Sequence, residues 1–405
     1  MRIGILTFHR AHSYGAVLQC YALQQTLAQM EHEVWVIDYR QPYIENLYYK
    51  VFNWKCFFSM VVHLHFRYIR DTILRAIYYH RYRKKYLHTT KKCDKDTIPP
   101  FDCYVIGSDQ LWSLHCTKET DKVYWGQFIR PFHSRVVGYA ISSTQDSLYQ
   151  MGETLIRHCL EAFSSLSFRE EIIGKLIYDM VGVKGETVLD PTLLLPFDYW
   201  NGFGSVEEKR MSVVVYLMRF RNSEEINRDI LRKAHQLAQL LKYEVTDLSA
   251  NIVSPETFLS YFKSARYVIT NSFHGVALAL IFEKPLYAIR SYDSLDERYV
   301  NLLSLVNGKQ MLADKDFSPI AMQIDYTTIR QNLAEQKYQR KHGDDHRAQP
   351  QYDGAAAAAG HVPQHLRAGQ PHQDVEHQHH PGAAQQIRQV QPPVFSHARP
   401  GQPGV

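Results

Sequence analysis

Three hydrogen-bonding side chains interrupt an otherwise apolar stretch of the chain. Asn271, Ser272 and His274 stand within VITNSFHGVALALIFEKPLYAI, which starts at Val268. The residues before them are typical of a buried strand, and GVALALIFEK after them is typical of a helix. Residues 271–275, the NSFHG turn, would therefore present the free N–H groups of a helix start to an anion. A histidine at that point adds the capacity for proton transfer.

A second interpretation of the NSFHG turn needs no ligand. Asn271 and Ser272 are common helix caps, and their side-chain oxygens would then accept hydrogen bonds from the first turn of the helix. His274 would be a surface histidine. The turn by itself leaves both interpretations open.

Polar residues also follow strand-like runs in the first half of the chain. Ser108 and Asp109 end the run YVIGSD, and Ser13 and Gly15 follow the first apolar run. Either Ser108 or Asp109 could instead cap the next helix. Asp190 in VLDPTLLL precedes a proline, which is typical of a turn that ends a strand.

These residues need a scaffold of alternating strands and helices. The runs at residues 3–8, 15–29 and 32–40 predict strand, helix and strand, a βαβ unit with parallel strands. Further strand-like runs, each leading into a polar or Gly/Pro turn, lie at residues 101–112, 135–142 and 185–195. An α/β doubly wound domain over residues 1–196 is the expected fold.

A second series of strands and helices begins after Trp200. It predicts strands near 211–220, 243–249 and 266–273 and helices near 226–242 and 254–265. Ser254 before Pro255 is a helix-start signal. We therefore predict a second α/β domain over residues 211–330, meeting the first near residues 196–212 across a cleft lined by the carboxyl ends of the strands.

Composition narrows the class of protein. The chain has 405 residues, enough for two domains, and 13% of them are aromatic, as in a packed protein. A formal charge of +5 spread over this length does not indicate nucleic-acid binding. Six cysteines without zinc-ligand spacing predict no metal site. The start MRIGILTFHR lacks the features of a signal peptide, so a cytoplasmic location is expected.

Residues 48–88 are rich in aromatic side chains, Arg and Lys, with few acids. The segment is too interrupted by charge to span a bilayer. Either it forms amphipathic helices that cover the first sheet, or it lies in a membrane interface.

The composition changes again near residue 341. Residues 341–405 are dominated by Ala, Gly, Pro, Gln, His and Arg, a mixture that cannot bury enough apolar surface to fold. This tail is predicted to be disordered, and its abrupt start suggests a shift of reading frame near the end of the gene.

Five motifs stand together in an order that resembles the polysaccharide pyruvyl transferase family. They are the first strand and helix through QQTL, YVIGSDQLW, SFREE, VLDPTLLL, and the long run from SPETF through the NSFHG turn to LYAI, with RYVNLL after it. The resemblance implies a two-domain fold similar to GT-B glycosyltransferases. It also implies transfer of a pyruvyl group from phosphoenolpyruvate to a glycan or lipid-linked sugar, with no cofactor.

The resemblance also implies roles for particular residues. His274 would be the general acid and Asp109 the base toward the acceptor hydroxyl, or a binder of two sugar hydroxyls. Arg169 matches the family's donor-binding arginine, although an ion pair with Glu170 or Glu171 is the alternative. Arg298 would be a cation of the cleft, or a surface partner of Asp296. The remaining residues expected at the substrate are Asn271, Ser272, Ser108 and Gly15.

Two other functions fit the same fold. One is a GT-B glycosyltransferase that uses a nucleotide sugar. The other is a sugar-binding protein without catalytic activity, inactivated by the altered tail. If residues 48–88 contact lipid, the protein would work at the inner face of the membrane.

Overall fold

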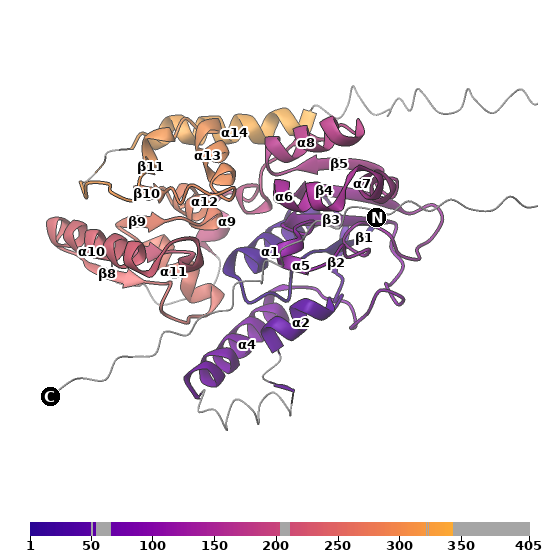
Figure 1. Ribbon diagram of the computed structural model, residues 1–405, viewed down its shortest axis with the longest axis horizontal. Coiled ribbons are helices and arrows are strands. Elements are labelled where there is room, and N and C mark those ends of the chain that lie inside the picture. The colour runs from indigo at the N-terminus through magenta and orange to yellow at the C-terminus, as the bar shows by residue number, and fades with distance from the viewer. Residues whose placement is uncertain (50–51, 54–65, 203–210, 321, 323, 343–405) are drawn as a thin grey trace, which may run out of the picture. The chain divides into compact units, whose positions relative to one another are not determined.

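Two separate parallel β-sheets organise the chain (Figure 1). The computed structural model describes residues 1–49, 52–53, 66–202, 211–320, 322 and 324–342. The first sheet has the order β2-β1-β3-β4-β5-β6 and the second the order β11-β10-β9-β7-β8. Every strand pair is parallel. The expected fold class, two doubly wound α/β domains, is therefore confirmed.

The first sheet and its helices occupy the first half of the chain. Its strands are β1 (Arg2–Leu6), β2 (Glu33–Val36), β3 (Cys103–Asp109), β4 (Arg135–Ile141), β5 (Ser165–Phe168) and β6 (Glu186–Thr187). Its helices are α1 (Tyr14–Ala28), α2 (Pro42–Tyr49), α4 (Phe66–Tyr86), α5 (Leu114–Thr117), α6 (Gln145–Met151), α7 (Glu153–Leu160) and α8 (Glu171–Val181). A short 3-10 helix, η2 (Pro191–Leu193), and α9 (Phe197–Asn201) lead towards the second half.

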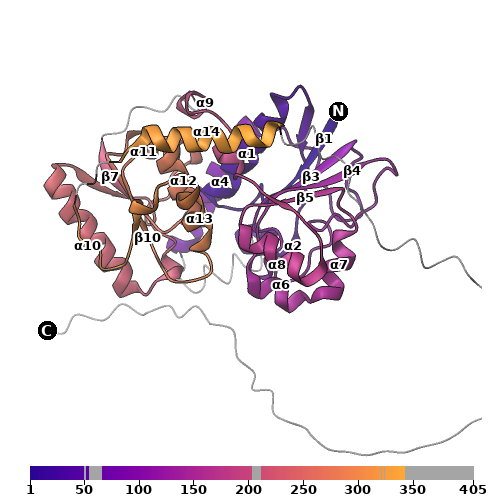
Figure 2. The ribbon, with the colours of Figure 1, turned by 90° about the horizontal axis from the view of Figure 1, so that it is seen from above.

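The second half repeats the same plan. Its strands are β7 (Ser212–Tyr216), β8 (Glu244–Asp247), β9 (Tyr267–Thr270), β10 (Leu286–Ile289) and β11 (Leu312–Ala313). Its helices are η3 (Arg219–Arg221), α10 (Glu224–Leu241), α11 (Pro255–Ser264), α12 (Phe273–Ile281), α13 (Glu297–Leu305), η4 (Lys309–Met311) and α14 (Tyr326–His342). Figure 2 shows α14 running from the second half towards the first.

Each sheet has one topological switch point. The chain turns to opposite sides of the sheet after β1 and β3 in the first half, and after β7 and β9 in the second. The loops at such a point diverge and leave a crevice at the carboxyl ends of the strands. Of the residues predicted at strand ends, Gly15 follows β1, Asp109 ends β3 and the NSFHG turn follows β9, so the topology brings them to the crevices. Asp190 follows β6 instead.

Helix α1 joins the cores of the two halves. Its residues from Tyr14 to Gln24 are all buried, so the helix has no solvent-facing side along this length. Val17 and Leu18 belong to the same apolar cluster as Val276 of α12. The ring of Tyr14 stacks on Phe258 of α11, with centroids 4.0 Å apart and planes 8° apart. Below the crevices the two halves therefore share one core.

The local signals explain most of the element boundaries. Ser254 accepts a hydrogen bond from the Thr257 backbone N–H and Pro255 occupies the first turn of α11, as predicted. The expected strand over 185–195 is much shorter, because β6 ends at Thr187 and Asp190 caps η2 instead. The last strand of the first sheet ends at Thr187, and the first strand of the second sheet begins at Ser212. The domain limits at residues 196 and 211 stay a prediction.

Helix α4 covers other elements than we expected. The interpretation of residues 48–88 as helices on the first sheet is only partly right. Tyr79 and Tyr82 of α4 lie in the shared core with α1, and the helix contacts α2 and α11. Residues 50–51 and 54–65 of this segment, and the tail from 343, lie outside the described residues. None of the helices in the described ranges is long and apolar enough to cross a membrane.

The shared core predicts a large effect of one aromatic residue. Replacing Phe258 by Ala should lower the free energy of unfolding by about 3–5 kcal/mol, because the ring is fully buried and stacks on Tyr14. Urea unfolding measures this change. The control is Phe132→Ala, whose ring is fully exposed and should change stability by less than about 0.5 kcal/mol. Similar values for the two variants would contradict a core shared through α1 and α11.

Candidate functional site

A pocket of about 300 Å³ lies where the two crevices meet. Residues of both halves line it, from the loops after β1, β3, β7 and β9. The predicted site residues among them are Gly15, Asp109, Asn271, Ser272, His274 and Arg298. Ser108 and Arg169 do not line the pocket and lie behind it. The structure thus brings six of the eight predicted residues to one space.

His274 is fixed between the two halves. It stands in the first turn of α12, and its side chain is 13% exposed. A Cβ atom on Gly15, at the start of α1, would lie 2.0 Å from the Nδ1 of His274. Glycine is therefore required at position 15, because any side chain there would displace the imidazole. The interpretation of His274 as a surface histidine is wrong, because its side chain is mostly buried.

Asp190 lies on the other edge of the imidazole. Its Oδ2 is 3.7 Å from the Nε2 of His274, and that nitrogen has no hydrogen-bond partner among the described residues. The carboxylate is fully buried and accepts hydrogen bonds from Ser108 Oγ at 3.1 Å and Arg169 Nη1 at 3.0 Å. It also accepts bonds from the backbone N–H and the hydroxyl of Thr192.

These neighbours keep the carboxylate of Asp190 ionised. Burial alone would raise the pKa of Asp190, but His274, Arg169 and Thr192 together hold the pKa well below its ordinary value. Asp190 is the main site residue that sequence reasoning undervalued. Its Asp-Pro motif indicated a turn, and the structure shows that one carboxylate both caps η2 and faces His274.

The guanidinium of Arg169 forms ion pairs with buried carboxylates. Its Nε donates to Glu170 at 3.0 Å, its Nη1 donates to Asp190, and its Nη2 lies 4.0 Å from Asp109. Burial would lower the pKa of Arg169, but the charges of Glu170, Asp190 and Asp109 raise it above its ordinary value. The predicted alternative, an ion pair with Glu170, is present, and the predicted contact with the donor stays a prediction.

Asp109 ends β3 in a conformation that few residues adopt. Its φ is +87°, and its Oδ1 accepts a hydrogen bond from the N–H of Gln110. Gly107, two residues earlier, has φ +132°, and a Cβ atom there would lie 1.9 Å from the carbonyl oxygen of Tyr139. The glycine thus lets β3 approach β4 closely while Asp109 turns towards the pocket. The Nε2 of Gln110 beside it is buried without a hydrogen-bond partner among the described residues.

The NSFHG turn does not use its side chains as caps. The Oδ1 of Asn271 accepts from the N–H of Met218 at 2.7 Å, which ties the ends of β9 and β7 together. Ser272 occupies the cap position of α12, but its side chain makes no capping bond. The capping interpretation is therefore wrong for both residues. Ser272 and the first residues of α12 line the pocket instead.

Arg298 is a cation of the pocket with no carboxylate partner in the part of the chain that the structure describes. Its Nε donates to the carbonyl of Leu295 at 3.3 Å, and it forms no ion pair with any described residue. Burial and the nearby charge of Arg169 lower the pKa of Arg298 to about 10. The alternative role as a surface partner of Asp296 is wrong, because Asp296 is buried and pairs with Arg221.

Arg221 was not predicted. It also lines the pocket, but Asp293 binds it through two hydrogen bonds and Asp296 through a third. Its neighbours in η3, Arg219 and Phe220, resemble those of any exposed turn in the sequence, so no local signal marks it. Within the described residues no three His, Cys, Asp or Glu side chains gather as a metal site.

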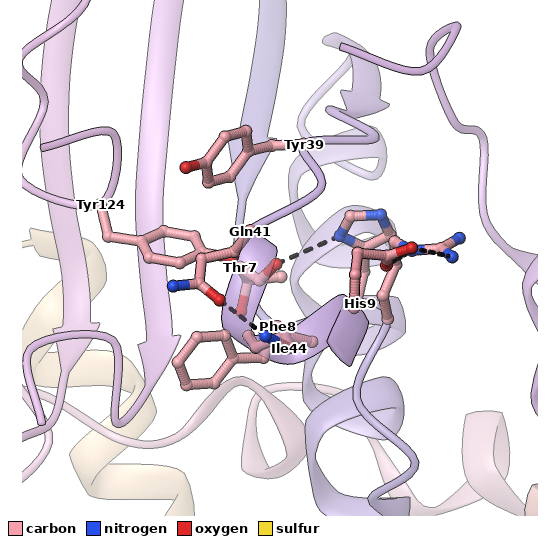
Figure 3. Close-up of a pocket in the computed structure, with 9 residues that line it drawn as sticks. Thr7, Phe8, His9, Tyr39, Gln41, Ile44 and Tyr124 are labelled. Atoms are coloured by element: carbon pink, nitrogen blue, oxygen red, sulfur yellow. Dashed lines mark hydrogen bonds and ion pairs between the residues drawn. The ribbon is translucent and has the colours of Figure 1, made fainter. Parts of the chain in front are cut away.

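A second cavity is too small to bind a ligand. Figure 3 shows it between Thr7, His9, Tyr39 and Tyr124, and it has no room for a water molecule. The side chains of Thr7, Tyr39 and Gln41 beside it already have hydrogen-bond partners. The Nδ1 of His9 lies 3.2 Å from the Thr7 carbonyl and its Nε2 lies 3.1 Å from Asp38. This cavity is a packing feature of the loop after β1.

The network around Asp190 predicts a pH-dependent loss of stability. Asp190→Asn should lower the free energy of unfolding by about 3–5 kcal/mol at neutral pH, because it removes the charge that balances buried Arg169. The folded-state pKa of Asp190 lies below the ordinary 3.8, so its contribution is complete above about pH 4 and is lost as the pH falls through the folded-state pKa. The difference between the two proteins should therefore narrow below about pH 4.

Urea unfolding of both proteins at a series of pH values measures this difference. Asp198→Asn is the control, since Asp198 is exposed on α9. A destabilisation by Asp190→Asn that stays constant down to strongly acidic pH would show that the lost charge is not its cause.

Comparisons with known structures give distant likenesses. The UDP-GlcNAc 2-epimerase of Methanocaldococcus jannaschii is 12% identical, with a TM-score of 0.38, and the match covers 84% of this chain and all of that one. The spinosyn forosaminyltransferase SpnP is 13% identical, with a TM-score of 0.38, covering 84% and 95%. S. aureus MnaA with UDP is 10% identical, with a TM-score of 0.39, covering 84% and 96%. The fold class rests on the strand order, not on these likenesses.

Sequence comparison identifies the family. No curated protein matches the chain. A model of the polysaccharide pyruvyl transferase family matches residues 14–294, from the first residue of α1 to the loop before α13. This range contains the NSFHG turn and Asp109, which line the pocket, and Arg169 and Asp190, which lie in the buried network next to it. The chain belongs to the polysaccharide pyruvyl transferase family.

Proposed function

We propose that the protein transfers a pyruvyl group from phosphoenolpyruvate to two hydroxyl groups of a sugar, forming a cyclic ketal. One observation supports the proposal: Arg298, which forms no ion pair with any described residue, lines the same pocket as His274 and the start of α12. Phosphoenolpyruvate carries a phosphate and a carboxylate, and fixed positive charge with oriented N–H groups is what such a donor requires.

The reaction needs one proton donor and one proton acceptor. A proton added to C3 of the donor makes C2 electrophilic, a sugar hydroxyl attacks C2, and the second hydroxyl completes the ketal as phosphate leaves. The two hydroxyls lose two protons. One is balanced by the proton added to C3, and the other leaves with the phosphate. A single pocket must therefore hold an acid, a base and the anion.

His274 is the acid in this proposal. Its Nε2 faces the ionised Asp190, which leaves Nδ1, beside Gly15, as the nitrogen for the substrate. Asp190 positions the ring in the way that a carboxylate orients a catalytic histidine in other enzymes. Asp190 is a positioning residue, since it is fully buried and does not line the pocket.

Asp109 is the base toward the sugar. It lines the pocket from the first half, whereas Arg298 and Ser272 line it from the second. The donor would thus lie against the second half, and the acceptor hydroxyls would lie beside Asp109. Gln110, whose buried Nε2 has no partner among the described residues, supplies a further hydrogen bond to a sugar oxygen.

The first prediction from this arrangement concerns catalysis. His274→Ala should lower kcat by about 10²–10⁴-fold, because it removes general acid help. The measurement is phosphate release from phosphoenolpyruvate with a glycan acceptor, with circular dichroism to confirm folding. Full turnover by a folded His274→Ala protein would refute the assignment. Release of a nucleoside diphosphate from a nucleotide sugar would instead support a glycosyltransferase.

Two glycine variants test whether the position of the His274 ring matters for catalysis when the ring itself is kept. Gly15→Ala should lower kcat because a Cβ would displace His274. Gly202→Ala is the matched control, since its nearest neighbour would lie 3.6 Å away in ordinary contact. Equal activity of the two variants would show that the position of the ring is unimportant. No turnover by the unchanged protein in either assay would favour a binding protein without catalytic activity.

A second prediction concerns the donor. Arg298→Ala should raise the KM for phosphoenolpyruvate by roughly 10–150-fold, which corresponds to a charge-assisted hydrogen bond of about 1.5–3 kcal/mol. The KM for the acceptor should change little. The control is Arg228→Ala, whose side chain is exposed on α10. If Arg298→Ala left the donor KM unchanged, the donor would bind elsewhere in the pocket.

A further inference from the structure

One side of α4 carries an unusual concentration of positive charge. The helix has seven Arg and Lys residues and a single acid, Asp71. Its buried side is formed by Ile69, Ala76, Tyr79, Tyr82 and Arg83. Five cations are exposed on the opposite side, and we call them the basic face: Arg67, Arg70, Arg81, Lys84 and Lys85. At about 3.6 residues per turn, all five lie within roughly a third of the helix circumference, so they share one side of the helix.

The charges of the basic face are mostly uncompensated. Arg70 pairs with Asp71 at 2.8 Å. Arg67, Arg81 and Lys84 form no ion pair with any described residue, and Lys85 lies 4.9 Å from the ring of Tyr86. By contrast, α10 balances three cations with three acids along its length. The basic face therefore attracts an extended anionic partner.

Apolar side chains are interleaved with these cations. Phe66 is 57% exposed and Ile77 is 38% exposed, and both lie on the same side of α4 as the basic face. Leu47 on the neighbouring α2 is 46% exposed. A membrane interface takes up both kinds of group, with cations at the anionic headgroups and apolar side chains below them. Nucleic acid would satisfy the cations and would leave the aliphatic Ile77 without a partner.

We propose that the basic face of α4, together with Phe66 and Ile77, binds an anionic lipid surface. Helix α2 connects this lipid-binding surface with the pocket. Figure 1 shows α2 beside α4, and Tyr43, Ile44, Leu47 and Tyr48 of α2 line the pocket. A bilayer at α4 would thus lie next to the pocket, where an acceptor sugar carried on a lipid could enter. This use rests on the proposed function, but lipid binding itself does not.

The first measurement is vesicle sedimentation of the full chain. We expect binding to phosphatidylcholine vesicles that contain phosphatidylglycerol as a minor lipid, and no binding to phosphatidylcholine alone. Binding should weaken above about 0.1 M salt, where charge attraction is screened over roughly 10 Å. Absence of binding to the anionic vesicles at low salt would overturn the proposal. It would leave phosphate release from phosphoenolpyruvate unaffected, so failure here is distinguishable from failure of the proposed function.

Charge reversal then locates the surface. Each cation near an anionic membrane contributes roughly fivefold to the partition coefficient. Combining Arg81→Glu, Lys84→Glu and Lys85→Glu should therefore lower binding to anionic vesicles by at least roughly a hundredfold. Circular dichroism confirms that the variant is folded.

A matched control changes the same charge elsewhere. It combines Lys122→Glu, Lys175→Glu and Lys184→Glu, three exposed lysines around the α7 and α8 side of the first sheet. Both views place α8 apart from α4 (Figures 1 and 2). The control should keep its vesicle binding. An equal loss in both variants would show that net charge, not α4, controls binding, and would overturn the proposal.

A charge-neutral variant distinguishes lipid from nucleic acid. Phe66→Ser with Ile77→Ser keeps every cation and should still reduce vesicle binding, because it removes the apolar groups that enter the interface. If this variant bound vesicles as well as the unchanged protein while single-stranded RNA displaced the vesicles, the basic face would be a nucleic-acid surface. The lipid proposal would then be wrong.

Discussion

The buried carboxylate of Asp190 is the interaction on which the site depends. An ionised carboxylate is stable away from water only when donors surround it. Here the donors come from the end of β3, the end of β5 and the first residues of η2, and the imidazole of α12 faces it from the second half. The contacts that stabilise the charge of Asp190 therefore fix the positions of β3, β5, η2 and α12 relative to one another. The position of His274 is a result of that requirement.

Topology decides which residues can take part. Both sheets have the same internal strand order, with the first two strands of each half reversed relative to the chain. The loops after the first and third strand of each half consequently run to opposite sides of the sheet and leave a crevice between them. Polar side chains on these loops can reach that crevice. Asp109, Asn271 and the start of α1 lie at such loops. Arg169 follows another strand and does not line the pocket. It acts on the site through its hydrogen bond to Asp190, which faces His274.

The sequence predicts the elements better than the network between them. The NSFHG turn, the Ser254 cap and the pocket positions of Gly15 and Arg298 follow from local patterns and from the family resemblance. The role of Asp190 does not, because Ser108 lies 82 residues away and His274 lies in the other half. Helix α1 shows the same limit. Its apolar residues surround the whole helix, so its pattern predicts a helix but no particular face, and its contact with α11 is invisible in the sequence.

The burial of α1 has a consequence for how this family can diversify. Helix α1 lies in the first half of the sequence but packs into the core of the second sheet. A gene exchange that transfers only one sheet would therefore break its packing. Recombination between relatives at the connection after α9 would separate Tyr14 from the Phe258 with which it stacks, and Gly15 from the His274 ring that it accommodates. The exchangeable module is therefore the second sheet together with the first helix of the chain, two segments that no single crossover joins.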